Sequence, residues 1–145
     1  MAEIREILPP ETASAFAALR ELRTHHSNVD AFVAQVDNVQ RPDGYRLLGV
    51  FEDGQSDAVA VLGFRFGTNL AWGKFCYIDD LSTSANARAR GFARALLDRV
   101  TEFAVEAGIS QIHLDSGVGP ERLSAHRLYL NAGYRITSYH FAQAN

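Results

Sequence analysis

Apolar residues recur along the chain with two periods, about two residues where a strand is expected and about 3.6 where a helix is expected. Residues 4–8 alternate apolar and polar side chains, which predicts a short strand that two prolines end. Phe16, Leu19 and Leu22 follow at three-residue spacing and predict a helix with one apolar side. A second helix is expected from Asp30, before the turn signal "RPDG".

Longer apolar runs, separated by turn signals, fill the rest of the chain. The most regular helical period begins after the segment "RARG". The elements predicted in this region are strands at 45–51, 58–66 and 75–82, a helix at 91–107, a strand at 109–114, a helix at 122–131 and a strand at 134–141.

The resulting element order, β-α-α-β-β-β-α-β-α-β, predicts an α/β fold with a mixed sheet. Strands 75–82 and 109–114 would be parallel and joined by a right-handed helical crossover. A ligand is expected at the carboxyl end of the first of these strands, where the helix begins. The length of 145 residues suits one domain, residues 1–145, with one core.

Composition narrows the class of protein. The net charge is -3 and the isoelectric point is near 5.9, which argues against a nucleic-acid or membrane-surface binder because such proteins carry a basic excess. The single cysteine, Cys76, cannot form an internal disulfide or a multi-cysteine zinc site, and we expect it to be a small buried residue. The N-terminus does not have the pattern of a signal peptide, so a cytoplasmic protein is expected.

Three arginines surround one glycine where the longest predicted helix begins, in "RARGFA" and the residue after it. A helix N-terminus already has unpaired N–H groups and partial positive charge, so extra cations there call for an anion. Gly91 allows close approach, the N–H groups of Ala89–Arg94 can point at one anion, and a diphosphate fits best. Arg88, Arg90 and Arg94 would add charge-assisted contacts. The alternative is a solvated basic helix start with an ordinary turn.

The second half of the chain resembles the GNAT superfamily, the GCN5-related N-acetyltransferases. "RARGFA" fits the family's cofactor loop, Gln/Arg-x-x-Gly-x-Gly/Ala, and it follows the strand segment "YIDDLSTS". "SAHRLYLNAGYRITSYHF" is similar to a second family motif, Ala-x-x-Leu/Phe-Tyr-x-x-x-Gly-Phe/Tyr. The resemblance extends from Phe75 to Phe141, whereas the N-terminal half matches only in its order of predicted elements.

The resemblance implies a GNAT fold, in which a splayed parallel strand pair forms the acyl-CoA cleft. It implies acetyl transfer from acetyl-CoA, as co-substrate and without a metal, to an amine that attacks directly. The cofactor-binding residues that it implies are Leu81, Ser82, Thr83, Arg88, Ala89, Arg90, Gly91, Phe92, Ala93 and Arg94.

By the same resemblance, Tyr129 is the general acid that protonates the CoA thiolate, because a phenol is protonated at neutral pH. The alternative for Tyr129 is packing. Asp79 and Asp80 point to opposite sides of a strand unless a bulge intervenes, and Asp80 is preferred as the group that activates the amine, with Asp79 as a substrate contact. Pairing of either carboxylate with an arginine is the alternative. In many relatives an asparagine contacts the cofactor at the position where this chain has Arg122. In this chain the contact is therefore lost, made by the arginine, or supplied by another residue.

Histidines supply further candidates. His25, between the first two helices, and His140, on the last predicted strand, are candidate substrate contacts, with solvated loop histidines as the alternative for His25 and its neighbour. His113 and Asp115 alternate along one predicted strand and would form a polar cluster on one face, or His113 is a structural histidine.

Three functions remain open on the residues alone: an N-acyltransferase, a non-catalytic CoA or acyl-CoA sensor or assembly module of the same fold, and another nucleotide-binding domain. Tyr129 favours catalysis, and the absence of a ribose-binding acid at the right distance disfavours the last. The low isoelectric point and Asp79 and Asp80 favour a cationic acceptor, a small metabolite, peptide terminus or protein lysine. A homodimer would place the last predicted strand in its interface, with burial in the core as the alternative for the apolar side chains of that strand.

Overall fold

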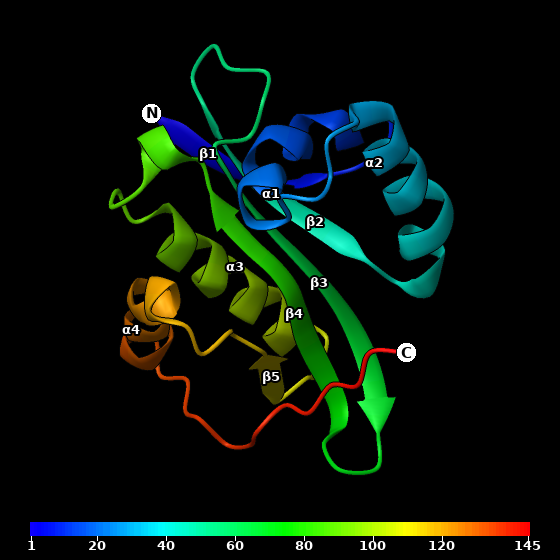
Figure 1. Cartoon of the computed structure of the whole chain (residues 1–145), viewed down its shortest axis with the longest axis vertical. Helices are drawn as coiled ribbons and strands as arrows, with labels where there is room; N and C mark the ends of the chain where they lie inside the picture. The colour runs from blue at the N-terminus through cyan, green and yellow to red at the C-terminus, as the bar shows by residue number, and fades with distance from the viewer. The chain divides into compact units, whose positions relative to one another are not determined.

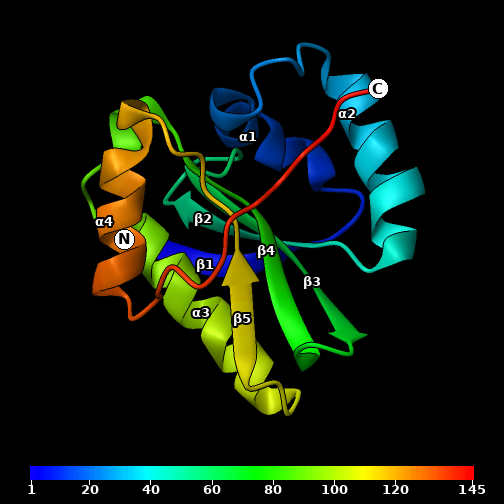
Figure 2. The same ribbon diagram turned by 60° about the horizontal axis from the view of Figure 1, so that its bottom comes forward.

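A five-stranded sheet in the order β1-β2-β3-β4-β5 organises the computed structural model, which describes residues 1–145. Its strands are β1 (Ala2–Ile7), β2 (Arg46–Glu52), β3 (Ala60–Asn69), β4 (Gly73–Thr83) and β5 (Gln111–Leu114). The first four strands pair antiparallel with their neighbours, whereas β5 runs in the same direction as β4 (Figure 2). The sheet is mixed, which confirms the predicted fold class.

The α-helices of the chain are α1 (Phe16–Leu22), α2 (Val29–Gln35), α3 (Phe92–Glu106) and α4 (Leu123–Asn131). Of these, α1, α2 and α3 cover the two faces of the sheet. Figures 1 and 2 show α1 and α2 on one face and α3 on the other. α2 begins where Asn28 Oδ1 accepts a hydrogen bond from the Ala31 N–H at 2.9 Å, and it continues into a further helical turn, Val36–Gln40.

The chain divides into two compact units, residues 1–113 and residues 114–145, and each is described by itself. The first unit contains α1, α2, α3 and the sheet up to His113 in β5. The second unit contains α4 and the segment that follows it. None of the helices combines the length and the apolar character that crossing a bilayer requires.

The sheet is buried on both faces. In β2, Leu47 and Phe51 belong to the apolar cluster beneath α1 and α2, and the intervening Leu48 and Val50 are equally buried. On the other face, α3 contacts β2, β3 and β4 with a buried stripe formed by Leu96, Leu97, Val100 and Ala104. Because both faces are covered, β2 is a continuous apolar run without polar alternation.

The strand predicted at 134–141 is wrong, since the structure has no strand in this segment. The apolar alternation of the segment changes phase at Ser138. Tyr134 and Ile136 would point to one face of a strand, and Tyr139 and Phe141 to the other. No single face is apolar along the whole segment, and Ile136, Tyr139 and Phe141 are exposed.

Candidate active site

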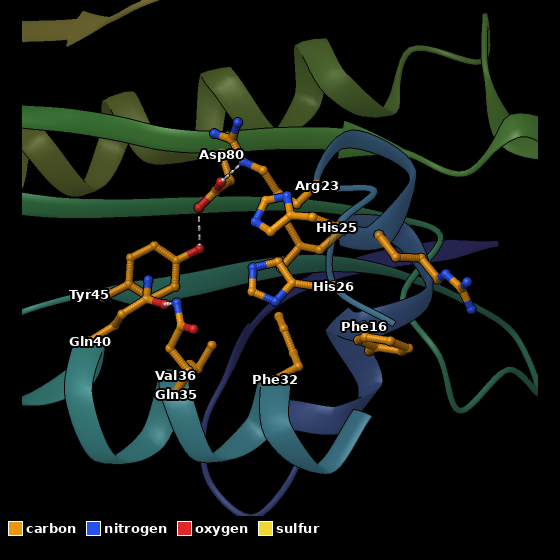
Figure 3. Close-up of a pocket in the computed structure, with 12 residues that line it drawn as sticks. Phe16, Arg23, His25, His26, Phe32, Gln35, Val36, Gln40, Tyr45 and Asp80 are labelled. Carbon is orange, nitrogen blue, oxygen red and sulfur yellow. Dashed lines mark hydrogen bonds and ion pairs between the residues drawn. The ribbon is translucent and has the colours of Figure 1, made fainter. Parts of the chain in front are cut away.

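A cavity of about 260 Å³ opens on the side of the sheet that carries α1 and α2 (Figure 3). Side chains from α1, from the loop after it, from α2 and its extension and from β4 surround the cavity. The lining residues are Phe16, Leu19, Arg20, Arg23, His25, His26, Phe32, Gln35, Val36, Gln40, Tyr45 and Asp80. Two of the predicted site residues, His25 and Asp80, are therefore brought to one pocket.

Asp80 is the centre of a hydrogen-bond network at one end of this pocket. Its Oδ2 accepts a hydrogen bond of 2.6 Å from the Tyr45 hydroxyl, and its Oδ1 accepts one of 2.8 Å from Arg23 Nε (Figure 3). Arg23 also donates to the main-chain oxygen of Asp79 at 2.8 Å. Burial, together with the negative charge of Asp80, holds the pKa of the Tyr45 phenol well above its ordinary value. Tyr45 is therefore a proton donor to Asp80 at neutral pH.

A β-bulge places Asp80 in this position. Gly63 of β3 pairs with Asp80, but the next residue of β3 pairs with Ile78, so Asp79 is the extra residue of β4. Gly63 is also required by packing, because a Cβ atom there would overlap the Tyr45 hydroxyl. Two adjacent strand residues point to opposite sides unless a bulge intervenes, and a bulge is present at Asp79 and Asp80.

Asp79 does not line the pocket. Its carboxylate accepts hydrogen bonds of 2.9 and 3.2 Å from Arg65 Nε on β3. Burial raises the pKa of the Asp79 carboxyl, and the Arg65 guanidinium opposes that rise. Both aspartates are paired with arginines, as the alternative to a substrate role predicted.

The turn before α3 has the backbone geometry of an open helix start. Ala89 and Gly91 have positive φ angles of 61° and 84°, and α3 begins at Phe92. The Ala95 N–H donates to the Gly91 oxygen at 3.0 Å, and no side chain caps the helix. The N–H groups of the first helical turn are the groups that a helix N-terminus offers to an anion.

The three arginines of this turn each have a carboxylate partner within the chain. The ion pairs are Arg88–Glu21 at 3.3 Å, Arg90–Glu52 at 2.6 Å and Arg94–Asp98 at 3.1 Å. The hydrogen bond from Arg90 lowers the pKa of the Glu52 carboxyl. The three arginine side chains are between 48% and 61% exposed, so these ion pairs contribute little to stability.

At the end of β4, main-chain groups can contact a ligand, but the Ser82 hydroxyl cannot because it already has a partner. Leu81, Ser82 and Thr83 pair with β3 on one side. The Ser82 hydroxyl is buried and donates to the Ala18 oxygen of α1 at 2.6 Å. Only the backbone of Ser82 is left to meet a ligand.

Tyr129 lies on α4 in the second unit. The side chain is buried, and burial raises the pKa of its phenol, while the adjacent Arg122 guanidinium lowers it in part. The centroid of the Tyr129 ring lies 6.1 Å from that of Tyr134. The main-chain N–H of Tyr134 donates a hydrogen bond of 2.9 Å to the main-chain oxygen of Tyr129. Tyr129 is thus a protonated phenol at neutral pH.

Other predicted candidates are engaged elsewhere. His113 stacks on Trp72 with the ring centroids 3.4 Å apart, and its Nε2 lies 2.8 Å from Gln111 Oε1. Asp115 follows β5, which ends at Leu114. Asp115 pairs with His140 at 3.4 Å within the second unit.

Cys76 is buried, as expected, and burial raises the pKa of its thiol to about 12. Such a thiol is not a nucleophile at neutral pH. No three histidine, cysteine, aspartate or glutamate side chains gather closely enough to hold a metal ion.

Sequence reasoning missed Arg23 and Tyr45 as site residues. Arg23 stands two residues before His25, and this proximity was its one available signal. Tyr45 is 35 positions from Asp80 along the chain and had no such signal.

Comparison with known proteins identifies the family. Residues 2–134 match the model of the acetyltransferase (GNAT) family. An uncharacterized N-acetyltransferase, YhdJ of Bacillus subtilis (strain 168), is 29% identical over 132 residues, covering 90% of this chain and 89% of the relative.

Solved structures share the fold. A Trypanosoma brucei acetyltransferase superposes with a TM-score of 0.82 at 17% identity, with all of both chains covered. The aminoglycoside N-acetyltransferase AAC(6')-Iy, solved in complex with CoA, superposes with a TM-score of 0.83 at 15% identity, covering 100% of this chain and 95% of the other. The family match over almost the whole sequence carries the assignment: the chain belongs to the acetyltransferase (GNAT) family and is an acyl-CoA-dependent acetyltransferase.

Proposed function

We propose that this acetyltransferase moves the acetyl group of acetyl-CoA to a primary amine by direct attack, without an acyl-enzyme. One observation carries the proposal. The strand β4 delivers Asp80 to the pocket, ends at Leu81–Thr83, and leads directly into the arginine–glycine turn before α3. An amine in the pocket and a thioester along the end of the strand would then meet at one place.

The cofactor site comprises the end of β4 and the following turn. Its residues are Leu81, Ser82, Thr83, Arg88, Ala89, Arg90, Gly91, Phe92, Ala93 and Arg94. The diphosphate of CoA would accept hydrogen bonds from the N–H groups at the start of α3 and replace the weak partners of the arginines. The pantetheine arm would pair with main-chain groups of Leu81–Thr83 as an added strand does.

Transfer requires three proton movements. The protonated amine loses one proton before attack, because only the neutral amine is a nucleophile, and its nitrogen loses a second proton after the bond to carbon has formed. Its nitrogen forms the new C–N bond with the acetyl carbon, the C–S bond breaks, and the thiolate takes a proton from the Tyr129 phenol. The buried, protonated state of Tyr129 supports this role.

Asp80 would position the amine and accept its proton, directly or through water. Arg23 and Tyr45 each donate to one carboxylate oxygen, and each oxygen retains a further lone pair for the amine. His25, which lines the pocket, is the second substrate contact that we propose. Asp79 and His140 stay predictions as substrate contacts, and Asp79 would have to leave Arg65 to act.

Thiol release from acetyl-CoA in the presence of a panel of amines tests the proposal. We expect amine-dependent release of CoA, with acetylated amine detected by mass spectrometry. Binding of acetyl-CoA without turnover of any amine would instead favour a sensor or assembly module. Gly91→Asp, which puts a carboxylate where the diphosphate is placed, should abolish CoA binding in calorimetry, and Gly117→Ala is the control.

We also propose a cytoplasmic location and a homodimer for the protein. The buried, unpaired thiol of Cys76 suits a reducing compartment. Ile136 and Phe141 expose large apolar side chains that a second copy would cover. Sedimentation of the wild type and of Phe141→Asp measures this, with a dimer expected only for the wild type.

A further inference from the structure

We infer that the acceptor is a small aromatic or bulky aliphatic monoamine, in contrast to a polyamine, an aminoglycoside or a lysine-rich peptide. This inference rests on the proposed function, because it names the substrate that the pocket beside Asp80 selects. Three properties of the pocket carry it: its apolar walls, its charge and its volume.

The walls of the pocket fit a hydrocarbon ring. Phe16 and Phe32 pack against each other with ring centroids 5.3 Å apart, and Leu19 and Val36 extend the apolar surface. His26 presents its ring edge-on to Phe32 at 6.3 Å (Figure 3). An aromatic ring in such a place gains both the burial of apolar area and the favourable geometry of ring pairs.

The charge of the pocket disfavours substrates with several cations. Its lining includes two arginines, Arg20 and Arg23, but only one carboxylate, Asp80, and Arg23 already binds that carboxylate. Arg20 lies 5.5 Å from the centre of the Phe16 ring and forms no ion pair. A substrate with a second positive charge would meet uncompensated repulsion, whereas a monoamine is helped toward the neutral form that attacks. Asp79 and Asp80 are each paired with an arginine, so they offer little free negative charge to a second cation of a substrate.

The volume of the pocket suits an acceptor with a single ring and a short arm. A cavity of about 150 Å³ holds benzene. The 260 Å³ of this pocket leave room for a ring and a two-carbon or three-carbon aminoalkyl chain that reaches Asp80. A multi-ring sugar or a peptide chain would remain largely outside.

Competition between amine classes tests the inference. With acetyl-CoA saturating, we expect kcat/KM for 2-phenylethylamine to exceed the values for spermidine and for a lysine-rich peptide by tenfold or more. A higher value for either of these multiply charged substrates overturns the acceptor class but leaves N-acetyl transfer in place. If no amine of any class is acetylated, the proposed function itself fails and the acceptor class falls with it.

Charge reversal at the pocket tests the reason for the selectivity. Arg20→Glu, at an exposed position, should lower the preference for 2-phenylethylamine over spermidine by about tenfold, because a nearby charge changes sign. Arg99→Glu, on α3 and outside the pocket lining, makes the same change in net charge and should leave the preference unchanged. An unchanged preference in Arg20→Glu, or an equal change in both variants, overturns the electrostatic argument.

A separate variant tests whether the pocket prefers an aromatic ring in the substrate. Phe16→Leu keeps the half-buried position apolar and should lower the ratio of kcat/KM for 2-phenylethylamine over isoamylamine by about threefold to tenfold. Melting curves of the variant and of the wild type confirm that the fold is retained. A ratio equal to that of the wild type overturns the aromatic part of the inference.

Discussion

At Asp80, one carboxylate accepts hydrogen bonds from two groups that are distant in the chain, Arg23 and Tyr45. The two contacts fix the position of the carboxylate in the lining of the pocket. At the scale of single residues, the candidate site is built from partners that hold a polar group in place.

Tyr129 is predicted to act on the leaving group and not on binding. Tyr129→Phe should lower kcat by about 10²-fold or more, because a positioned general acid contributes that much, with the Kd for CoA changed less than twofold. An assay of thiol release measures kcat, and calorimetry measures the Kd for CoA. Tyr139→Phe, at an exposed tyrosine, is the control. An unchanged kcat in Tyr129→Phe would remove the acid role.

Alkaline stability should report on the buried tyrosines. The pKa values of Tyr45 and Tyr129 are raised in the folded protein, mainly by burial, so above about pH 10 the unfolded chain loses protons that the folded chain retains. The free energy of unfolding therefore falls as the pH rises from about 10. Tyr45→Phe should reduce that slope by about 1.4 kcal/mol per pH unit.

Urea unfolding at several pH values measures the slope. Tyr139→Phe serves again as the matched variant, since its side chain is exposed. A slope in Tyr45→Phe as steep as that of the wild type would contradict the assignment.

At the scale of elements, β3 and β4 position the pocket through a single irregularity. The bulge at Asp79 and the absence of a side chain at Gly63 together let Tyr45 reach Asp80 across β3. A regular ladder would have kept the strict alternation of side chains along β4. The irregular part of the sheet is thus the part that holds the site.

The close packing at Gly63 leads to a stability prediction. Gly63→Ala should lower the free energy of unfolding by about 2 kcal/mol, because its Cβ would force the Tyr45 ring aside. In a Tyr45→Leu background the same change should cost less, so the two positions should couple in a double-mutant cycle. Gly117→Ala, where the nearest atom lies at an ordinary 3.5 Å, is the control. Additive losses at Gly63 and Tyr45 would contradict the contact.

At the scale of the whole molecule, the proposed chemistry draws on both units. The acceptor pocket and the arginine–glycine turn belong to residues 1–113, whereas the proposed acid Tyr129 belongs to residues 114–145. Transfer as proposed requires one molecule of acetyl-CoA to engage both units.

Hydrogen exchange tests that requirement. Saturating CoA should slow exchange of the amides at the start of α3 and also of those in α4, because a ligand that binds the folded state suppresses local opening where it binds. In Gly91→Asp both effects should disappear together. Protection limited to α3 would separate Tyr129 from the cofactor and contradict its role.

The local elements of the fold were predictable from the sequence, and its last segment was not. β1 to β5 and all four helices lie where the apolar patterns indicate, because each pattern repeats within a few neighbouring residues. The strand prediction for residues 134–141 was wrong because a strand needs one consistent apolar face as well as a partner strand. The change of phase at Ser138 removes the consistent apolar face.

What the sequence alone determined is the arginine–glycine start of α3, since the helix period, Gly91 and the three arginines are all local features. What only the tertiary structure decided is the pocket. The contact of Tyr45 with Asp80 spans 35 positions and that of Arg23 spans 57, and no spacing rule links them. The proposed acceptor preference rests on those long-range contacts, because the Arg23 guanidinium offsets the negative charge of Asp80 in the pocket.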